Sequence, residues 1–384
     1  MRAMIYIQRL ILVLVVGYAT LLSSCAVHEW PKDGEKLHSF IINLEYTTEM
    51  PLYKDEVLQS GRSASTAADD YDVRYTIEVY TTPSTPIEEP QVYVRRVFSR
   101  DDVTQLDNSV EMELPFGFYI FKVWTDYVDA GKTTDKFYDT SSFEDVIFNG
   151  PHVANNDFRD AFVGSLEAEI NELTTELTID NVRPMGKFIF ISNDLEKFIE
   201  HMLELKAESE SESESESESE SESEAEDNTT SGPNTEASTP SRVIDVSEYK
   251  VVFTYASFMP DDFNVLRDEA WDAADPNTVS FESSIKKISD SEAELGFDYV
   301  FVNDDELRIQ IVVEVFDKKG VSVSRTNKIT VPLLRGQYTI VRSNFLTSQA
   351  KGGVGINPSF EGPDHVVWVE YDDNTLKNKL HKNL

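Results

Sequence analysis

Alternation of apolar and polar residues is the dominant pattern along the chain. In residues 73–80 every second side chain is apolar, from Val73 to Val79. Successive side chains of a strand point to opposite faces, so this run predicts a strand with one apolar and one polar face. Similar runs predict strands at residues 40–45, 91–98, 110–114, 118–124, 173–179, 187–192, 249–256, 279–285, 294–302, 307–316, 321–329, 337–345 and 366–371.

Turn-forming residues separate these runs at short intervals. Pro, Gly, Asn and Asp occur at residues 115–117, 129–131, 303–305 and 317–320. Short strands joined by frequent turns are typical of antiparallel β-sandwiches. We therefore expect an all-β protein with enough strands for two sandwich domains in tandem.

One segment departs from the alternation. Leu195, Phe198, Ile199 and Met202 recur at helical spacing. They predict one short helix over residues 194–206, whose apolar stripe packs against a sheet.

A low-complexity tract follows the predicted helix. Residues 208–224 alternate strictly between Ser and Glu, and residues 227–241 are rich in Asn, Thr, Ser, Gly and Pro. The tract has nothing apolar to bury and its like charges repel one another. We therefore expect a disordered, extended insertion at residues 207–242.

The strand pattern favours a domain boundary at residues 181–184. A cut there gives an N-terminal domain of residues 38–181 and a C-terminal domain of residues 182–384, each with enough strands for a sandwich. The Ser-Glu tract is then a loop insertion in the second domain, which costs little because closure entropy grows slowly with loop length. A boundary at the Ser-Glu tract itself is the alternative.

The N-terminus has the pattern of an export signal. Arg2 and Arg9 precede an uncharged apolar run at residues 10–22. This run is too short to cross the hydrocarbon layer of a bilayer as a helix, and it fits the apolar region of a signal peptide.

The sequence Leu-Ser-Ser-Cys at residues 22–25 resembles the lipobox of bacterial lipoproteins. In such signals the peptidase cuts before the Cys, whose thiol carries the lipid. We expect a signal peptide at residues 1–24, cleavage between Ser24 and Cys25, acylation of Cys25 by chains such as palmitate, and a flexible tether at residues 25–37. An ordinary secretory signal is the alternative.

Charge and cysteine content narrow the range of partners. The 384 residues include 34 Lys and Arg against 70 Asp and Glu, for a net charge of −36. This excess of negative charge repels phosphate, so nucleic acid is not an expected partner. A single Cys excludes a disulfide framework, and its expected acylation removes it as a nucleophile.

The sequence offers no clear catalytic motif. The six His form no close metal-binding pair, and there is no GxSxG elbow and no Walker loop. Adjacent acids at residues 101–102, 261–262, 304–306 and 372–373 do not by themselves make the paired carboxylates of a glycosidase. The turn at residues 124–131 has oxygens for Ca²⁺ but lacks EF-hand spacing. We expect a non-enzymatic protein with no catalytic, cofactor or metal site.

Aromatic residues suggest a second class of function. Trp124, Tyr127, Phe137 and Tyr138 surround one predicted loop, and Trp271 lies in another. Exposed rings could stack on sugars, but packing in the core is the favoured interpretation. A surface lipoprotein that binds a glycan or a host ligand is therefore kept as the alternative function.

Several segments resemble an uncharacterised family of fimbrillin-like lipoproteins of the Bacteroidales. They are the lipobox and residues 124–129, 182–188, 294–302, 345–347 and 353–358. The resemblance implies two tandem transthyretin-like antiparallel β-sandwich domains. It also implies that a strand carrying Arg183 and Lys187 opens the second domain.

The resemblance further implies a structural role at the outer membrane or cell surface, as a fimbrium-like anchor or subunit in adhesion or assembly. Its partners would be the membrane, through the lipid on Cys25, and fimbrial subunits, through strand addition. In related shaft subunits, proteolysis after an Arg near the first strand frees a groove for a neighbour's strand. Arg62 is the candidate for that cleavage, whereas an anchor would keep its lipid and need no trimming.

Overall fold

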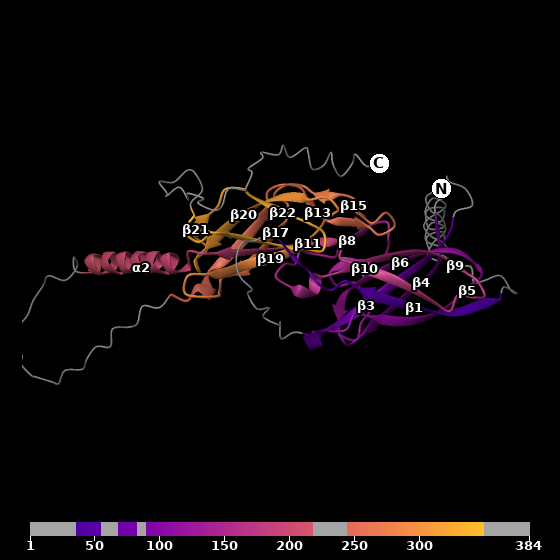
Figure 1. The fold of residues 1–384 in the computed structure, drawn as a ribbon. Helices are drawn as coiled ribbons and strands as arrows, with labels where there is room; N and C mark the ends of the chain where they lie inside the picture. Colours follow the sequence, from indigo (N-terminus) through magenta and orange to yellow (C-terminus); the bar gives the residue numbers. More distant parts are fainter. Residues whose placement is uncertain (1–35, 55–67, 83–89, 218–243, 349–384) are drawn as a thin grey trace, which may run out of the picture.

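The computed structural model describes residues 36–54, 68–82, 90–217 and 244–348. Within these residues the protein is mainly β-strand with one α-helix (Figure 1), so the predicted β-rich class is confirmed. Ser24, Cys25, Arg62, the strand predicted at residues 366–371 and residues 218–242 of the Ser-Glu insertion lie outside the described residues. Three short 3-10 turns complete the described structure: η1 (Ala68–Asp70), η2 (Asp157–Arg159) and η4 (Val246–Glu248).

The first half of the chain forms one seven-stranded sheet in the order β4-β3-β6-β9-β10-β1-β5. Its strands are β1 (Leu37–Tyr46), β3 (Tyr71–Thr81), β4 (Gln91–Arg100), β5 (Asn108–Pro115), β6 (Gly117–Asp129), β9 (Phe162–Ile170) and β10 (Glu176–Val182). All except β9 overlap a predicted strand.

This sheet encloses its own core. All seven strands contribute to one apolar cluster, which includes Phe40, Val79, Val110 and Phe121. β9 and β10 pair over only two residues, so the strands β4-β3-β6-β9 and the strands β10-β1-β5 meet at a short corner and enclose the cluster together. In addition β1 pairs with β10 in parallel, whereas we expected antiparallel strands only. A parallel pair needs a long crossover connection, which no local turn signal marks.

The second half has two sheets that share a core. One has the order β18-β19-β11-β23-β2, in which the edge strand β2 comes from the first half of the chain, and the other has the order β17-β12-β20-β21 with β22 also paired to β20. Side chains such as Phe188, Leu295, Phe253 and Ile311 come from both sheets and pack together. The strands are β2 (Leu52–Lys54), β11 (Met185–Ser192), β12 (Lys250–Tyr255), β17 (Ser280–Ser284), β18 (Lys286–Lys287), β19 (Ala293–Phe301), β20 (Leu307–Phe316), β21 (Ser322–Arg325), β22 (Ile329–Leu333) and β23 (Tyr338–Ser343).

Short strands join the two halves at a seam. From the first half, β7 (Tyr138–Asp139) and β8 (Val146–Phe148) share a four-stranded sheet with β14 (Asp262–Asn264) and β15 (Glu269–Ala270) of the second half. β13 (Met259–Pro260), which lies before β14 in the chain, pairs with β16 (Ala273–Ala274), which lies after β15. The boundary predicted at residues 181–184 covers the last two residues of β10 and the two residues before β11, and the backbone pairs at the seam cross it.

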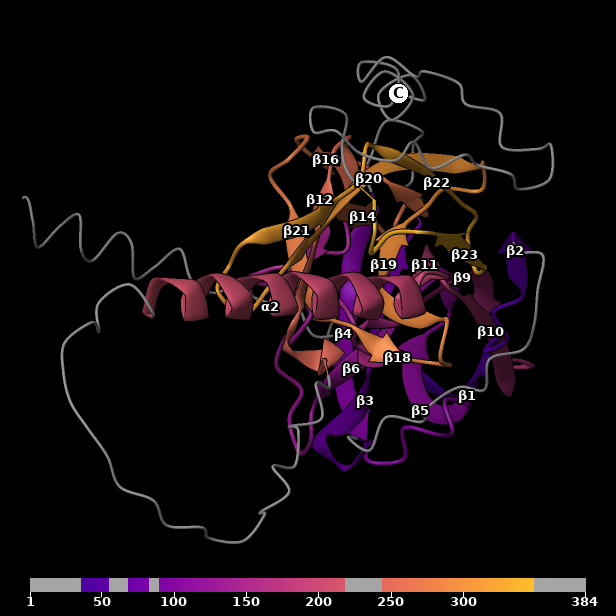
Figure 2. The ribbon, with the colours of Figure 1, turned by 90° about the vertical axis from the view of Figure 1, so that its left-hand side faces the viewer.

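The single described helix, α2 (Leu195–Ser217), is longer than predicted. Leu195, Phe198 and Met202 in its first turns are buried in the core of the second half, and the rest of the helix projects from the body (Figures 1 and 2). Residues 207–217, which we expected to be part of an extended loop, are helical. Packing of the first turns supplies the costly nucleus, and each further residue then adds at little cost because Glu is a good helix former.

Candidate functional site

Buried ion pairs fix the geometry around the seam. Arg74 of β3 binds both carboxylate oxygens of Asp126 on β6, at 2.8 Å from Nε and 2.6 Å from Nη2. Arg183, which follows β10, binds Asp160 through Nε at 2.8 Å and two backbone carbonyls through Nη1. These side chains are nearly inaccessible to solvent, so their charges serve the fold.

A second network surrounds Asp298 of β19. Its fully buried carboxylate accepts hydrogen bonds from Arg159, from the Tyr255 hydroxyl at 2.7 Å and from His152 Nε2 at 2.5 Å. Burial opposes the charge of Asp298, but Arg159 and His152 outweigh it and hold the pKa of Asp298 below its ordinary value. The other ring nitrogen of His152, Nδ1, has no hydrogen-bond partner within the described part of the chain. No nucleophile is therefore bonded to this His-Asp pair there.

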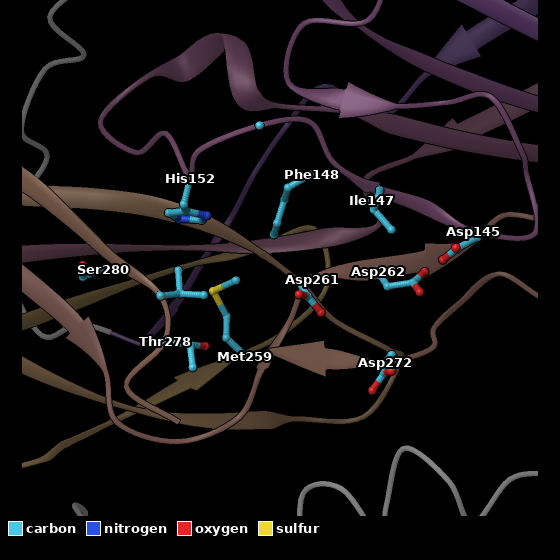
Figure 3. A pocket seen from close by; sticks show the side chains of 12 residues that line it. Asp145, Ile147, Phe148, His152, Met259, Asp261, Asp262, Asp272, Thr278 and Ser280 are labelled. Atoms are coloured by element: carbon cyan, nitrogen blue, oxygen red, sulfur yellow. The ribbon is translucent and has the colours of Figure 1, made fainter. Parts of the chain in front are cut away.

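A pocket of about 480 Å³ lies at the seam, beside His152 (Figure 3). Its apolar lining includes Ile147, Phe148 and Met259. Its polar lining includes four carboxylates, one from the first half and three from the second: Asp145, Asp261, Asp262 and Asp272. The side chains of Asp145 and Asp262 point toward each other (Figure 3).

Asp262 is the buried member of this group, with 8% of its surface exposed. Burial, followed by its contact with Asp145, raises the pKa of Asp262 to about 8. Burial also raises the pKa of Asp261. The raised pKa favours the protonated form of the Asp262 carboxyl group at neutral pH.

Because the pKa of Asp262 is raised in the folded state, the unmodified (parent) protein should lose stability as the pH rises. The folded state holds the Asp262 proton up to about pH 8, whereas the unfolded chain releases it near pH 4. Asp262→Asn removes this loss. In metal-free buffer we therefore expect the variant to gain about 1–3 kcal/mol over the parent at pH 8.5, because solvent in the open pocket screens much of the ~1.4 kcal/mol that each unit of pKa difference would otherwise contribute. At pH 4 the two should be nearly equal. Urea unfolding at both pH values measures this, and a stability difference that does not grow with pH would contradict it.

Two unpaired strand edges border a groove on the first sheet. β4 pairs only with β3, and β5 pairs only with β1, among the strands of the described chain. Their free edges line a groove of about 370 Å³ between Arg96, Phe98 and Ser99 on one side and Ser109 and Glu111 on the other. The Arg96 guanidinium donates to the backbone carbonyl of Glu111 across this groove. Among the described strands, the groove therefore has an unpaired strand edge on each side, and the Arg96 side chain spans it.

Exposed apolar side chains gather at one end of the same sheet. Leu37 pairs with Pro115 in register, and Phe118 pairs with Glu169. The ring of His38 lies 5.6 Å from that of Phe116 and bonds the carbonyl of Thr174. These contacts place four exposed side chains at one end, which we call the apolar tip: Leu37, Phe116, Phe118 and Leu173.

The sequence-family comparison covers nearly all of the described chain. A family model described as "Family of unknown function (DUF6562)" matches residues 38–380. The chain belongs to the DUF6562 family. No curated protein sequence matches it.

Solved structures give distant similarities to this DUF6562 chain. A candidate polysaccharide-binding protein from Bacteroides thetaiotaomicron is 11% identical, with a TM-score of 0.39 over 75% of this chain and 80% of that one. A candidate cell adhesion protein from Bacteroides ovatus is 11% identical, with a TM-score of 0.38 over 82% and 95%. A fimbrial assembly protein from Parabacteroides distasonis is 8% identical, with a TM-score of 0.33 over 80% and 91%. Similarity at this level does not establish a function.

The predicted aromatic site is mostly core. Trp124, Phe137 and Tyr138 are buried in the apolar cluster of the seam, so the favoured core interpretation is confirmed for them and they cannot stack on a sugar. Trp271 is only half-buried, and Arg267 lies over its ring at 4.6 Å. The glycan-binding alternative therefore loses its main group of rings.

The other predicted candidates are dispersed. In the turn at residues 124–131, Asp126 is bound to Arg74 and Asp129 lies beside two lysines, so both carboxylates already have cationic partners. Asp102 caps its own loop through Thr104, and residues 372–373 lie outside the described residues. The sequence did not indicate the pocket carboxylates Asp145 and Asp272, because the strand pairing that gathers them with residues 261–262 is not encoded locally.

Proposed function

We propose that this DUF6562 protein is a surface lipoprotein that acts by non-covalent contact, as an anchor or structural subunit of a fimbrium-like assembly. It would be held at the outer membrane or cell surface by acyl chains on Cys25 and would catalyse no reaction. The observation that carries the contact role is the pair of unpaired edges of β4 and β5 with a groove between them.

The apolar tip supports attachment to a membrane. Eleven residues separate Cys25 from Leu37, and at full extension they reach at most roughly 40 Å. The end of the sheet that carries Leu37, Phe116, Phe118 and Leu173 is therefore the end nearest an acylated Cys25. Among the helices of the described chain, none is long and apolar enough to cross a bilayer.

Strand addition is the contact that the groove favours. A strand from another chain would satisfy the free backbone groups of β4 or β5, since an open sheet edge pairs readily with an extended segment. It would also displace the bridge from Arg96 to Glu111. Charged side chains such as Arg96 on an edge are a common protection against indiscriminate pairing.

Cleavage after Arg62 would produce a trimmed structural subunit, the alternative to an anchor that keeps its lipid. β1 and β2 both precede Arg62 in the chain, and β1 pairs with β10 on one side and β5 on the other. Loss of β1 would leave a slot of one strand's width along the core. The N-terminal residue of the mature protein distinguishes the forms: Cys25 for an anchor and Ser63 for a trimmed subunit.

The contact role predicts a partner at the groove. A photo-crosslinking amino acid at Ser99, which lines the groove, should join the protein on intact cells to a second surface chain. The same amino acid at Val321, which is exposed on the second half, is the matched control and should give no such adduct. Equal labelling from both positions, or none from Ser99, would overturn the proposal.

A further inference from the structure

Among the buried acids of the described residues, Asp262 differs from the others in having a buried carboxylate oxygen without a hydrogen-bond partner. Four buried acids each lie within an ion pair to an arginine: Glu78, Asp126, Asp160 and Asp298. Two more, Asp72 and Asp194, accept backbone N–H groups. Asp262 is as buried as these, yet its Oδ1 has no hydrogen-bond partner in the residues that the structure describes.

The described surroundings of Asp262 add negative charge and supply no lysine or arginine to offset it. Asp145 faces it, and Asp261 and Asp272 line the same pocket (Figure 3). Within the described residues the lining contains no Lys or Arg, and Nε2 of its one histidine, His152, is already bonded to Asp298. Bringing such carboxylates together is costly unless a proton or a cation lies between them.

We propose that the pocket binds a divalent cation, Ca²⁺, bridged between the carboxylates of Asp145 and Asp262. No three acidic, His or Cys side chains in the described residues converge as metal ligands, so waters and other oxygens would complete the shell. Ca²⁺ takes six to eight oxygens in flexible geometry, and about 480 Å³ leaves room for a hydrated ion.

The ion would link the two halves of the protein. Asp145 directly precedes β8, and Asp262 begins β14, the strand with which β8 pairs. The site is thus distinct from the proposed surface contacts and does not depend on Cys25.

The test uses the full chain after treatment with EDTA. Addition of CaCl2 at pH 7 should raise the unfolding temperature. Isothermal titration calorimetry should report the binding of one Ca²⁺ per chain at this pocket. Asp262→Asn and Asp145→Asn should each abolish both responses, whereas Asp305→Asn, which removes the same charge from an exposed loop, should keep them.

The two pocket variants show whether a lost Ca²⁺ response reflects the loss of the site or a failure to fold. Asp262→Asn mimics the protonated residue and is expected to fold at least as well as the parent, so a missing Ca²⁺ response in it cannot be blamed on unfolding. If the parent does not respond to CaCl2, the proposal is wrong. If both pocket variants respond as the parent does, the ion binds elsewhere, for example at the Ser-Glu tract, and the proposal is equally wrong.

Discussion

Replacing Arg74 with methionine is expected to lower the free energy of unfolding by about 3–5 kcal/mol. Arg74 is 2% exposed and its partner Asp126 is fully buried. Burial already raises the pKa of Asp126, and removal of the guanidinium leaves this carboxyl group in the interior with neither water nor its main partner, so that it must take up a proton or stay charged at a high cost. Urea denaturation followed by circular dichroism measures the loss.

Two further variants separate this effect from a general sensitivity to charge. Lys132→Ala breaks the exposed pair with Asp129, whose side chains are 57% and 43% accessible, and should change the stability by less than about 0.5 kcal/mol. Adding Asp126→Leu to Arg74→Met should recover most of the loss, because no buried charge remains. A single Arg74 variant as stable as the Lys132 variant would contradict this account of the first sheet.

Trp124→Ala is expected to cost about 3–5 kcal/mol. Trp124 is fully buried, and its ring lies 5.4 Å from Tyr138 of the first half and 6.2 and 6.3 Å from Phe263 and Phe301 of the second. The substitution leaves a cavity where the two halves meet. We therefore expect unfolding to change from one thermal transition toward two, as the halves lose their shared core.

Trp271→Ala is the matched control for Trp124. Trp271 is half-buried, and the Arg267 guanidinium lies 4.6 Å from the centre of its ring. A cation–π contact at an accessible site contributes about 0.5–1 kcal/mol, so this variant should lose about that much and keep a single transition. Comparable losses from the two tryptophans, or an unchanged transition in Trp124→Ala, would show that the seam does not couple the halves.

The positions of most strands are predictable from the sequence, but the residues that cover their faces are not. Alternation in residues 73–80 predicted β3, yet both faces of β3 are buried. Its polar face is covered because Arg74 reaches Asp135 and Arg95 bonds both Glu78 and the carbonyl of Thr140. Partners so far apart in the chain leave no local signal.

Two other differences between the predicted and the observed strands have separate physical causes. β9 was missed because Gly164 and Ser165 interrupt its alternation and its remaining Glu and Ala residues favour helices in isolation. The parallel pairs of β1 with β10 and of β11 with β23 depend on long crossovers. Local periodicity reports which residues form a strand, but not which strand becomes its neighbour.

The candidate site is likewise only partly predictable from the sequence. Residues 261–262 are adjacent acids in the sequence, but adjacency does not indicate which of them is buried. That depends on the pairing of β14 with β8, which brings Asp145 from a distant part of the chain. Cys25 and Arg62, in contrast, were inferred from local motifs, and they remain predictions.

Metabolic labelling of the protein with palmitate, in parallel with its Cys25→Ser variant, tests the central claim most directly. An anchor and the precursor of a trimmed subunit both pass through acylation at Cys25. The account therefore predicts label on the parent chain in the membrane fraction and none on the variant. A parent chain that is made and exported without label would contradict it.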